Sequence, residues 1–242
     1  LMFLLHKCYR YRMTVAVLAD IVGSRRLPDR VAAQRVLDEV IATVERELPA
    51  SLQPIHPLRP TTGDEQQAVF ATLEAALAFI LQLQLTLPDG LEFRFGIGIG
   101  PIGAVASSSG DLMDGPGWWA ARAAIDVVHA KQQRTIPSAR SWIVGAPEED
   151  VTMHAIVAFA NAYLLTRDEL VGAMNERARR LTSGRLRGLT QRELAHAEGI
   201  TQPAVSQALS SAGAASIIEG YRAITTALVH SLETPLKSEA RR

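Results

Sequence analysis

The spacing of apolar residues changes along the first hundred positions, and each change predicts a new element. Residues 14–22 form a valine-rich run that is typical of a buried strand. Residues 29–48 and 72–87 place apolar side chains about every 3.6 residues, which predicts two helices. Two short runs, residues 52–59 and 65–71, flank a Gly-Asp turn and therefore predict a hairpin between the two helices.

A further strand is predicted at residues 91–99, where apolar side chains alternate with a period of two and glycines allow close approach of another backbone. The order is then that of a ferredoxin-like βαββαβ unit. Residues 106–117 are small, polar and glycine-rich, which predicts a loop. Residues 118–131 predict another helix and residues 141–145 an edge strand, so the fold class is α+β.

The last hundred residues predict helices alone. Residues 151–181 have a helical pattern, either continuous or broken, and lead toward a compact C-terminal part. We therefore expect a palm-like domain over residues 13–150 and a connecting helix over residues 151–185. A small all-α helix-turn-helix domain is expected over residues 186–235.

The C-terminal part has the spacing of a helix-turn-helix. Thr190 and Glu193 fit a capping box that begins one helix. Gly199 supplies the left-handed conformation that a tight turn requires, and Thr201 caps the helix that follows. An ordinary helical hairpin is the alternative. The joint spacing of cap, turn glycine and apolar positions favours DNA binding.

The second helix of this motif is predicted to read double-stranded DNA, because Val205 and Leu209 form its buried stripe and leave polar side chains outward. The residues expected to contact DNA are Arg185, Arg187, Thr190, Gln191, Arg192, Thr201, Gln202, Ser206, Gln207 and Ser210. Arginines between positions 177 and 192 have no acidic residue among them, which predicts a phosphate-contacting patch, with a solvated helix end as the alternative. Since the second helix lacks arginine, we expect a homodimer.

Composition narrows the class of protein only slightly. The chain has 242 residues with 25 Lys and Arg against 25 Asp and Glu, so its net charge gives no support to nucleic-acid binding. The single cysteine, Cys8, cannot form an intramolecular disulfide, and the first residues do not read as a signal peptide, so we expect a cytoplasmic protein. The most apolar run, residues 68–87, is interrupted by polar residues and predicts no membrane span. Residues 1–12 match neither period and are expected to be an upstream extension.

Two aspartates are candidates for chemistry in the palm-like domain. Asp20 ends the first predicted strand and Asp64 lies in the hairpin turn, and a ferredoxin-like sheet brings these two places together. Such a pair can hold Mg²⁺ or Mn²⁺ against a triphosphate, while backbone amides of residues 22–25 can cradle phosphates. A turn cap at Asp20 and an ordinary hairpin turn at Asp64 are the alternatives.

Four segments together resemble the SatD family: residues 18–25 (LADIVGSR), 62–67 (TGDEQQ), 93–100 (FRFGIGIG) and 115–122 (GPGWWAAR). The resemblance covers nearly the whole chain, and members with a C-terminal helix-turn-helix are similar even in residues 189–209. The family has no well-established biochemical activity. More distantly, the same segments resemble class III nucleotidyl cyclases and GGDEF enzymes, which share a palm-like fold, use two metal ions and work as dimers.

The cyclase resemblance implies roles for individual residues. Asp20 and Asp64 match two metal-binding aspartates, and in an active enzyme they would be catalytic together with Arg122, which matches an arginine that stabilises phosphate charge. Asp111 falls near a base-selecting position. The implied nucleotide-binding residues are Gly23, Ser24, Arg25, Asp111 and Arg122.

Two departures from the cyclase pattern favour a sensor over an enzyme. Pro60 replaces an expected lysine and Trp118 an expected asparagine, so purine selection and transition-state positioning are both in doubt. Trp118 and Trp119 either stack on a base or pack at a helix start.

We expect a DNA-binding transcriptional regulator whose palm senses a nucleotide, with Mg²⁺ or Mn²⁺ as the implied cofactor. An active nucleotidyl cyclase or nucleotidyltransferase is one alternative, and a palm that only dimerises the protein is another.

Overall fold

The computed structural model describes residues 14–61, 64–105 and 112–233. Three features of the sequence lie outside these residues: Cys8, Asp111 and the extension expected at positions 1–12.

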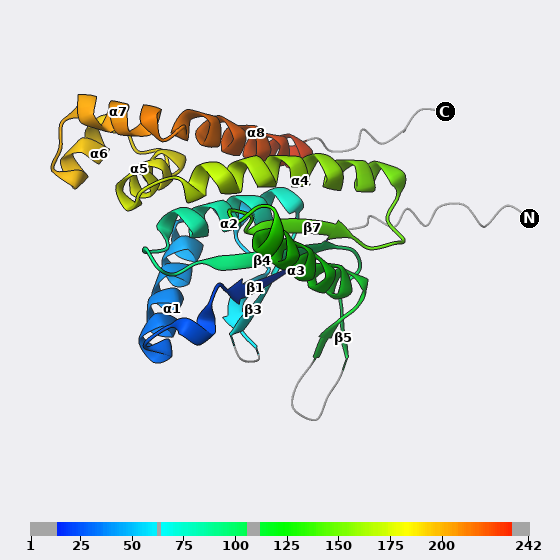
Figure 1. Ribbon diagram of the computed structural model, residues 1–242. Helices are drawn as coiled ribbons and strands as arrows, with labels where there is room; N and C mark the ends of the chain where they lie inside the picture. The colour runs from blue at the N-terminus through cyan, green and yellow to red at the C-terminus, as the bar shows by residue number, and fades with distance from the viewer. Residues whose placement is uncertain (1–13, 62–63, 106–111, 234–242) are drawn as a thin grey trace, which may run out of the picture.

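A five-stranded mixed sheet lies at the centre of the N-terminal part (Figure 1). Its strands, in spatial order, are β2 (His56–Pro60), β3 (Glu65–Phe70), β1 (Val15–Ile21), β4 (Phe93–Ile99) and β7 (Ser141–Gly145). β1 pairs antiparallel with both β3 and β4, and β2 pairs antiparallel with β3, whereas β4 and β7 are parallel. The strands expected from the sequence are confirmed. β2 begins later than expected because a 3-10 turn, η2 (Ala50–Leu52), precedes it.

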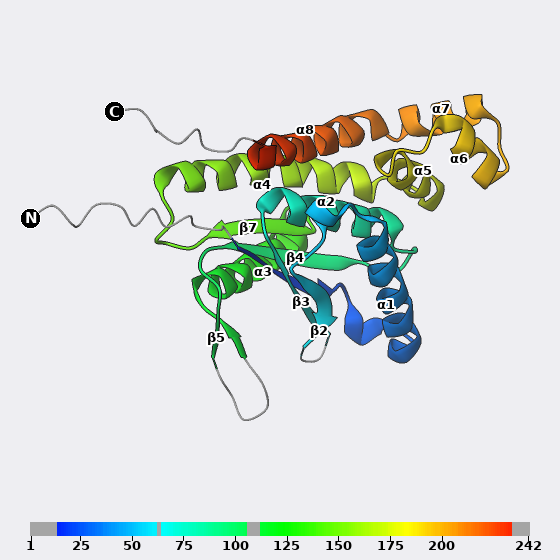
Figure 2. The same cartoon turned by 180° about the vertical axis from the view of Figure 1, so that it is seen from behind.

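Helices cover both faces of the sheet (Figures 1 and 2). α1 (Arg30–Glu47) and α2 (Leu73–Thr86) cover one face, and α3 (Pro116–Arg134) covers the other. Alternate residues of β1 divide between two hydrophobic clusters, so that Val17 packs toward α1 and α2 while Leu18 packs toward α3. The strand is thus buried on both faces, as its valine-rich run predicts.

The glycines of β4 allow α3 to lie directly on the strand. A Cβ atom at Gly98 would come within 1.9 Å of the carbonyl oxygen of Gly117, and one at Gly96 within 2.3 Å of the carbonyl oxygen of Ala121. The close backbone approach expected at these glycines is confirmed. The prediction of a loop at residues 106–117 is only partly correct, because β6 (Leu112–Asp114) lies within this range and pairs with β5 (Gly103–Val105) as a two-stranded ladder.

Helices alone follow the sheet, as expected: α4 (Val151–Gly172), α5 (Glu176–Leu186), α6 (Gln191–Glu198), α7 (Gln202–Ser211) and α8 (Ala214–Glu233). The helical run predicted at residues 151–181 is broken, because Asn175 caps the start of α5 through the N–H of Ala178. α4 and α8 lie side by side along the top of the molecule, and α6 and α7 lie at the end far from β5 (Figures 1 and 2). In the part of the chain that the structure describes, no helix combines the length and apolar character that a membrane span requires.

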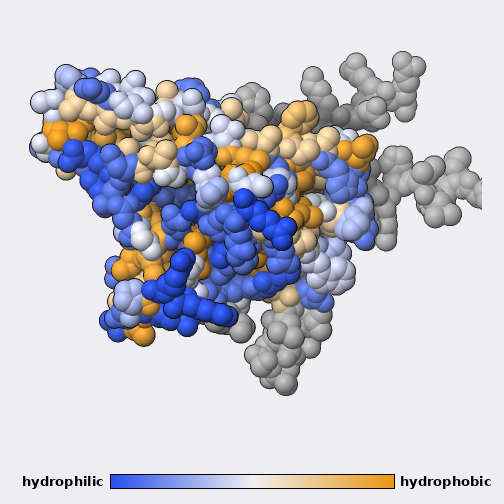
Figure 3. Space-filling view, viewed as in Figure 1, coloured by the Kyte–Doolittle hydropathy of each residue, from blue (hydrophilic) through white to orange (hydrophobic). Residues whose placement is uncertain are grey.

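α4 exposes large apolar side chains on its outer surface. Val151 is 83% exposed and Phe159 is 80% exposed, and Ile156 is exposed as well. Figure 3 shows hydrophobic surface over part of this helix. Isolated apolar residues are common on protein surfaces, but three on one helix form a patch that suits contact with another chain.

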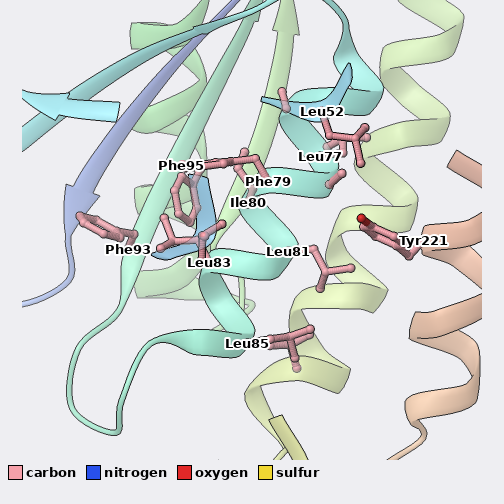
Figure 4. Close-up of a cluster of buried hydrophobic side chains, with 14 of the residues drawn as sticks. Leu52, Leu77, Phe79, Ile80, Leu81, Leu83, Leu85, Phe93, Phe95 and Tyr221 are labelled. Carbon is pink, nitrogen blue, oxygen red and sulfur yellow. The ribbon is translucent and has the colours of Figure 1, made fainter. Parts of the chain in front are cut away.

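α2 lies at the centre of the largest hydrophobic cluster. It is apolar almost all round because the sheet packs on one side and α5 and α8 pack on the other. Figure 4 shows Phe79 of α2 beside Phe95 of the sheet. On the other side of α2, Leu81 of the same helix points toward α8, which contributes Tyr221. The same cluster continues into α6 and α7 through Leu194 and Val205. The division of the chain into domains stays a prediction.

Side chains of α4 satisfy the free edge of β7. The amide of Asn161 accepts from the N–H of Ile143 at 2.8 Å and donates to its carbonyl oxygen at 2.9 Å. The buried carboxylate of Asp168 accepts from the N–H groups of Arg140 and Ser141 at 2.7 and 2.8 Å. Since unpaired strand edges invite association with other chains, α4 protects this edge as a further strand would.

Candidate functional site

Asp20 occupies the C-terminal end of β1 within a row of charged residues. Its register partners are Glu65 on β3 and Arg94 on β4. Asp20 is two residues after Leu18, so both side chains point to the face of the sheet that α3 covers. Nη2 of Arg94 lies 2.9 Å from Oδ2 of Asp20, and the Arg94 side chain is only 8% exposed. The first expected aspartate is therefore bound to a buried cation from the neighbouring strand.

Asp64 lies next to Asp20, as the predicted hairpin requires. A hydrogen bond from the Ser24 side chain lowers the pKa of Asp64, and its interaction with Asp20 lowers it further. Burial raises the pKa of Asp20, Arg94 opposes that shift, and the Asp64 carboxylate adds to it. The structure thus brings together three residues of the expected site: Asp20, Asp64 and Ser24.

These residues line a surface pocket with a cavity volume of about 530 Å³. Gly23 and Arg25, both expected at a nucleotide site, also line it. Sequence reasoning missed the four other basic side chains that line it: Arg26, Arg30, Arg94 and His129. Arg94 had a signal in the sequence, since it is the only charge in the apolar strand run Phe93 to Ile99. The other three lie on a turn and on two helices, and only the fold reveals that they meet.

The turn after β1 shapes the floor of the pocket. Gly23 has a φ of +68°, and the short turn η1 (Ser24–Arg26) follows it. A Cβ atom at Gly23 would lie 3.1 Å from Nη2 of Arg26, so the guanidinium group is folded over this glycine. The N–H of Val22 donates to the carbonyl oxygen of Glu92 at 2.9 Å. Of the amides expected to cradle phosphates, that of Val22 is therefore already engaged.

Arg122 is paired with Glu65 and is not among the residues that line the pocket. Its Nη2 donates to Oε1 of Glu65 at 2.8 Å, and Nη1 makes a second contact with Oε2 of the same carboxylate. This hydrogen bond raises the pKa of Arg122 above its usual value.

The two tryptophans of α3 have different surroundings. Trp118 packs against the face of the sheet that α3 covers. Trp119 is 63% exposed, and its Nε1 donates to Oδ1 of Asp114 at 2.8 Å. Packing, rather than base stacking, therefore accounts for Trp118.

The chemistry of this pocket suits an anion better than a resident divalent cation. Arg94 neutralises Asp20, the more buried of the two carboxyl groups. Within the described residues no third His, Cys, Asp or Glu joins the pair as a metal ligand. Four arginine side chains line the same pocket, so a divalent cation would enter a positive field. Two carboxylates, one of them paired with Arg94, give Mg²⁺ or Mn²⁺ an incomplete donor set in the protein alone, and the expected cofactor stays a prediction.

A second group of candidate residues lies at the junction of α6 and α7. Thr190 caps α6, with its Oγ1 accepting from the N–H of Glu193 at 3.2 Å and its N–H donating to Oε2 of Glu193 at 2.7 Å. The predicted capping box is confirmed. Gly199 closes α6 in the left-handed conformation, with φ of +65°, and Thr201 caps α7 through the N–H of Ala204.

α7 presents one buried and one exposed face. Val205 and Leu209 are buried against the neighbouring helices. The polar residues expected to contact DNA on this helix are all exposed: Gln202, Ser206, Gln207 and Ser210. α7 packs against α5, α6 and α8, so its outer face is fixed by three neighbours.

The arginines between positions 177 and 192 do not form the free basic patch expected from the sequence. Nε and Nη2 of Arg180 bind the two carboxylate oxygens of Glu198 at 2.8 and 2.9 Å, and Nε of Arg177 lies 3.8 Å from the same carboxylate. Nη1 of Arg187 lies 2.7 Å from Oε2 of Glu47, and Nη2 of Arg179 lies 2.6 Å from Oδ1 of Asp89. The acidic partners come from distant parts of the sequence, which is why the local pattern did not reveal them.

Two arginines of this group have no salt bridge within the described residues. Nη1 of Arg185 donates to the carbonyl oxygen of Leu189 at 2.5 Å, and Arg192 is exposed in the first turn of α6. Gln191 precedes Arg192 at the start of this helix. α6, which carries Gln191 and Arg192, lies at the same end of the molecule as α7 (Figure 1).

The sequence matches one protein family over most of its length. The profile of the SatD family (SatD) matches residues 14–226. No curated protein matches the chain. Among solved structures, the chain is similar to a bacterial light-regulated adenylyl cyclase, with 16% sequence identity and a TM-score of 0.35, over 51% of this chain and 72% of the cyclase chain.

Proposed function

The chain belongs to the SatD family, and we propose that it is a DNA-binding transcriptional regulator in which the sheet part senses a nucleotide. In this proposal α6 and α7 are the two helices of a helix-turn-helix, with α7 in the major groove. The exposed polar face of α7 carries the proposal. Gln202 and Gln207 can each form two hydrogen bonds with an adenine edge, and Ser206 can bond to bases or phosphates.

The turn between α6 and α7 supports this assignment. Only three residues separate the helices, and Gly199 has the positive φ that such a tight turn needs. Ala195 is buried on α6, and its small side chain allows the helices to cross closely. Thr190 and Thr201 cap the two helices, which fixes where each helix begins relative to the turn.

We also infer that the first four sheet strands with α1 and α2 form a ferredoxin-like unit. The spatial order β4, β1, β3, β2 and the antiparallel pairing support this topology. The pocket beside Asp20 then lies at the end of β1, where it is available to a nucleotide. Because α2 packs against both the sheet and α5 and α8, a ligand in the sheet part has a continuous packed route to the helices.

Dimerisation is part of the proposal, with a second copy of this chain on α4. Arg185 and Arg192 give each copy few phosphate contacts, so two copies are needed for a useful affinity. The exposed apolar residues Val151, Ile156 and Phe159 support α4 as the contact surface. A symmetric pair would carry two copies of α7, one on each chain.

The alternative of an active nucleotidyl cyclase or nucleotidyltransferase has less support. Arg94 occupies the carboxylate of Asp20, and Glu65 holds Arg122 in two contacts. Trp118 is buried where the cyclase pattern has an asparagine that positions the transition state. The site therefore favours binding without turnover.

DNA binding is tested by fluorescence anisotropy with a labelled pool of random-sequence duplexes between 50 and about 200 mM salt. We expect binding that weakens steeply with salt. In Arg192→Gln the slope of the logarithm of the binding constant against the logarithm of the salt concentration should become shallower by about one to two. Arg35→Gln, an exposed arginine on α1, is the matched control and should leave the salt dependence unchanged. Absence of duplex binding at the lowest salt concentration would refute the proposal.

A further inference from the structure

We infer that the pocket beside Asp20 and Asp64 binds the phosphate groups of a nucleoside di- or triphosphate directly through arginine side chains, without a divalent cation. The inference rests on the proposed nucleotide sensing by the same pocket. It goes further by assigning the recognition of the phosphates to four arginines, Arg25, Arg26, Arg30 and Arg94.

The balance of charge in the pocket favours an anion. Four arginines and two aspartates line it, which leaves an excess of two positive charges before His129 is considered. Asp20 already has its positive partner in Arg94, so only Asp64 opposes the three exposed arginines. A di- or triphosphate carries enough negative charge to balance this excess, and a divalent cation would increase it.

Arg94 is a fixed cation in the wall of the pocket. Its side chain is more than nine-tenths buried, and one Nη atom binds Asp20. Its Nε atom is buried and has no hydrogen-bond partner within the described residues. A buried guanidinium group with an unused donor is costly unless a ligand or water completes it. Because Arg94 also lines the pocket, its positive charge is held at a fixed place in the wall, where an anion can compensate it.

The other three arginines that line the pocket are exposed hydrogen-bond donors. Arg25 and Arg26 extend from the turn after Gly23, and Arg30 extends from the first turn of α1. All three are exposed, so their planar guanidinium groups can turn toward phosphate oxygens and bind them in pairs. The cavity volume of about 530 Å³ suits a ligand of nucleotide size rather than a single phosphate ion.

Isothermal titration calorimetry on the full chain separates direct binding from metal-mediated binding. Inorganic tripolyphosphate, ATP and adenosine are each titrated in EDTA and again in excess MgCl₂. We expect tripolyphosphate and ATP to bind in EDTA with affinities within about threefold of those in MgCl₂ or tighter, and adenosine not to bind. ATP that binds more tightly than tripolyphosphate would identify a nucleotide, and equal affinities an inorganic polyphosphate.

Variants with opposite expected effects test the roles of the side chains. Arg26→Ala and Arg30→Ala should each weaken tripolyphosphate binding about tenfold, because each removes a charged hydrogen-bond donor. Arg35→Ala, one helical turn beyond Arg30 and outside the pocket, should have no effect. Asp64→Asn should strengthen binding, since it removes a negative charge. If Asp64 were a metal ligand, the same substitution would abolish binding. Circular dichroism verifies that each variant is folded.

The outcomes distinguish this inference from the proposed function. Binding that requires MgCl₂ and is lost in Asp64→Asn would overturn the direct role of the arginines and leave nucleotide sensing intact. If no phosphate compound binds under either condition, both the inference and nucleotide sensing fail. DNA binding, measured separately by anisotropy, would still stand or fall on its own result.

Discussion

Gly98 lies directly beneath the backbone of α3, where no side chain fits. A methyl group there would approach the carbonyl oxygen of Gly117 to 1.9 Å and the backbone nitrogen of Ala121 to 2.4 Å. Neither the strand nor the helix can yield without breaking its own hydrogen bonds, so Gly98→Ala should reduce the free energy of unfolding by at least about 3 kcal/mol. Urea unfolding followed by circular dichroism measures this change.

Gly172 provides the matched control for that substitution. It ends α4, and a Cβ atom there would meet nothing within 4 Å among the described residues. Gly172→Ala should therefore leave stability unchanged or raise it by up to about 1 kcal/mol. Equal effects of the two substitutions would contradict the packing of α3 on β4.

Glu198 links α5 to α6 and makes stability depend on pH. The hydrogen bond from Arg180 lowers the pKa of Glu198, and Arg177 acts in the same direction. A carboxyl group whose pKa is lower in the folded state stabilises the fold above its unfolded value, about 4.5, and this contribution is lost as the pH falls through the folded value. Because Arg180 is half exposed, Glu198→Gln should cost only about 1 kcal/mol at pH 7 and nothing at pH 2.

Thermal melts between pH 2 and pH 7 measure this dependence. Glu219→Gln serves as the control, because Glu219 forms an exposed ion pair with Arg222 within α8 and should contribute almost nothing. A loss of stability in Glu198→Gln that is the same at pH 2 and pH 7 would contradict an ionic link between α5 and α6.

The residues of the site show how far the sequence alone could be interpreted. The meeting of Asp20 and Asp64 could be predicted, because it follows from the order of strands and turns. The salt bridge between Arg94 and Asp20 could not, because it depends on the register between two strands that are distant in the sequence. The same holds for Arg187 and Glu47, which are 140 positions apart.

At the scale of elements, α4 takes the place of a strand at the edge of β7. Asn161→Ala would leave the N–H and carbonyl group of Ile143 without their partners, and both are buried. We expect a loss of about 2 to 3 kcal/mol in the free energy of unfolding and a greater tendency to aggregate through the open edge. Denaturant unfolding and size-exclusion chromatography measure these two effects.

Thr166→Ala, also on α4, is the control for the edge of β7. Among the residues that the structure describes, the Thr166 hydroxyl bonds within its own helix, to the carbonyl oxygen of Ala162. Its replacement should change stability by less than about 0.5 kcal/mol. Comparable losses in the Asn161 and Thr166 variants would contradict a specific role of the Asn161 amide.

The elements themselves were largely predictable, because each depends on a short-range pattern. Apolar spacing located the helices and strands, and the capping residues Thr190 and Thr201 located the starts of α6 and α7. The β5 and β6 ladder was not predictable, since small residues and glycines give the same local pattern in a loop and in a short hairpin. The break between α4 and α5 at Asn175 was left open because Asn is tolerated both inside helices and at their caps.

At the scale of the whole molecule, the apolar surface of α4 is the proposed contact between two copies. Phe159 is 80% exposed on this surface, so Phe159→Glu should convert the dimer to a monomer. Phe159→Leu keeps the apolar character and should remain dimeric. Light scattering coupled to size-exclusion chromatography measures the mass of each. A wild-type monomer, or a Phe159→Glu variant with the mass of a dimer, would contradict this assignment.

Sequence specificity tests the proposed DNA-binding role of α7 most directly. A duplex selected by the wild-type chain from a random library is compared with a scrambled duplex of the same length at fixed salt. The Gln202→Ala and Gln207→Ala double variant should lose most of the preference for the selected duplex, about 10²-fold or more, and retain its affinity for the scrambled one. Gln133→Ala on α3 should keep the full preference. An unchanged preference in the double variant would contradict the proposal that α7 reads DNA.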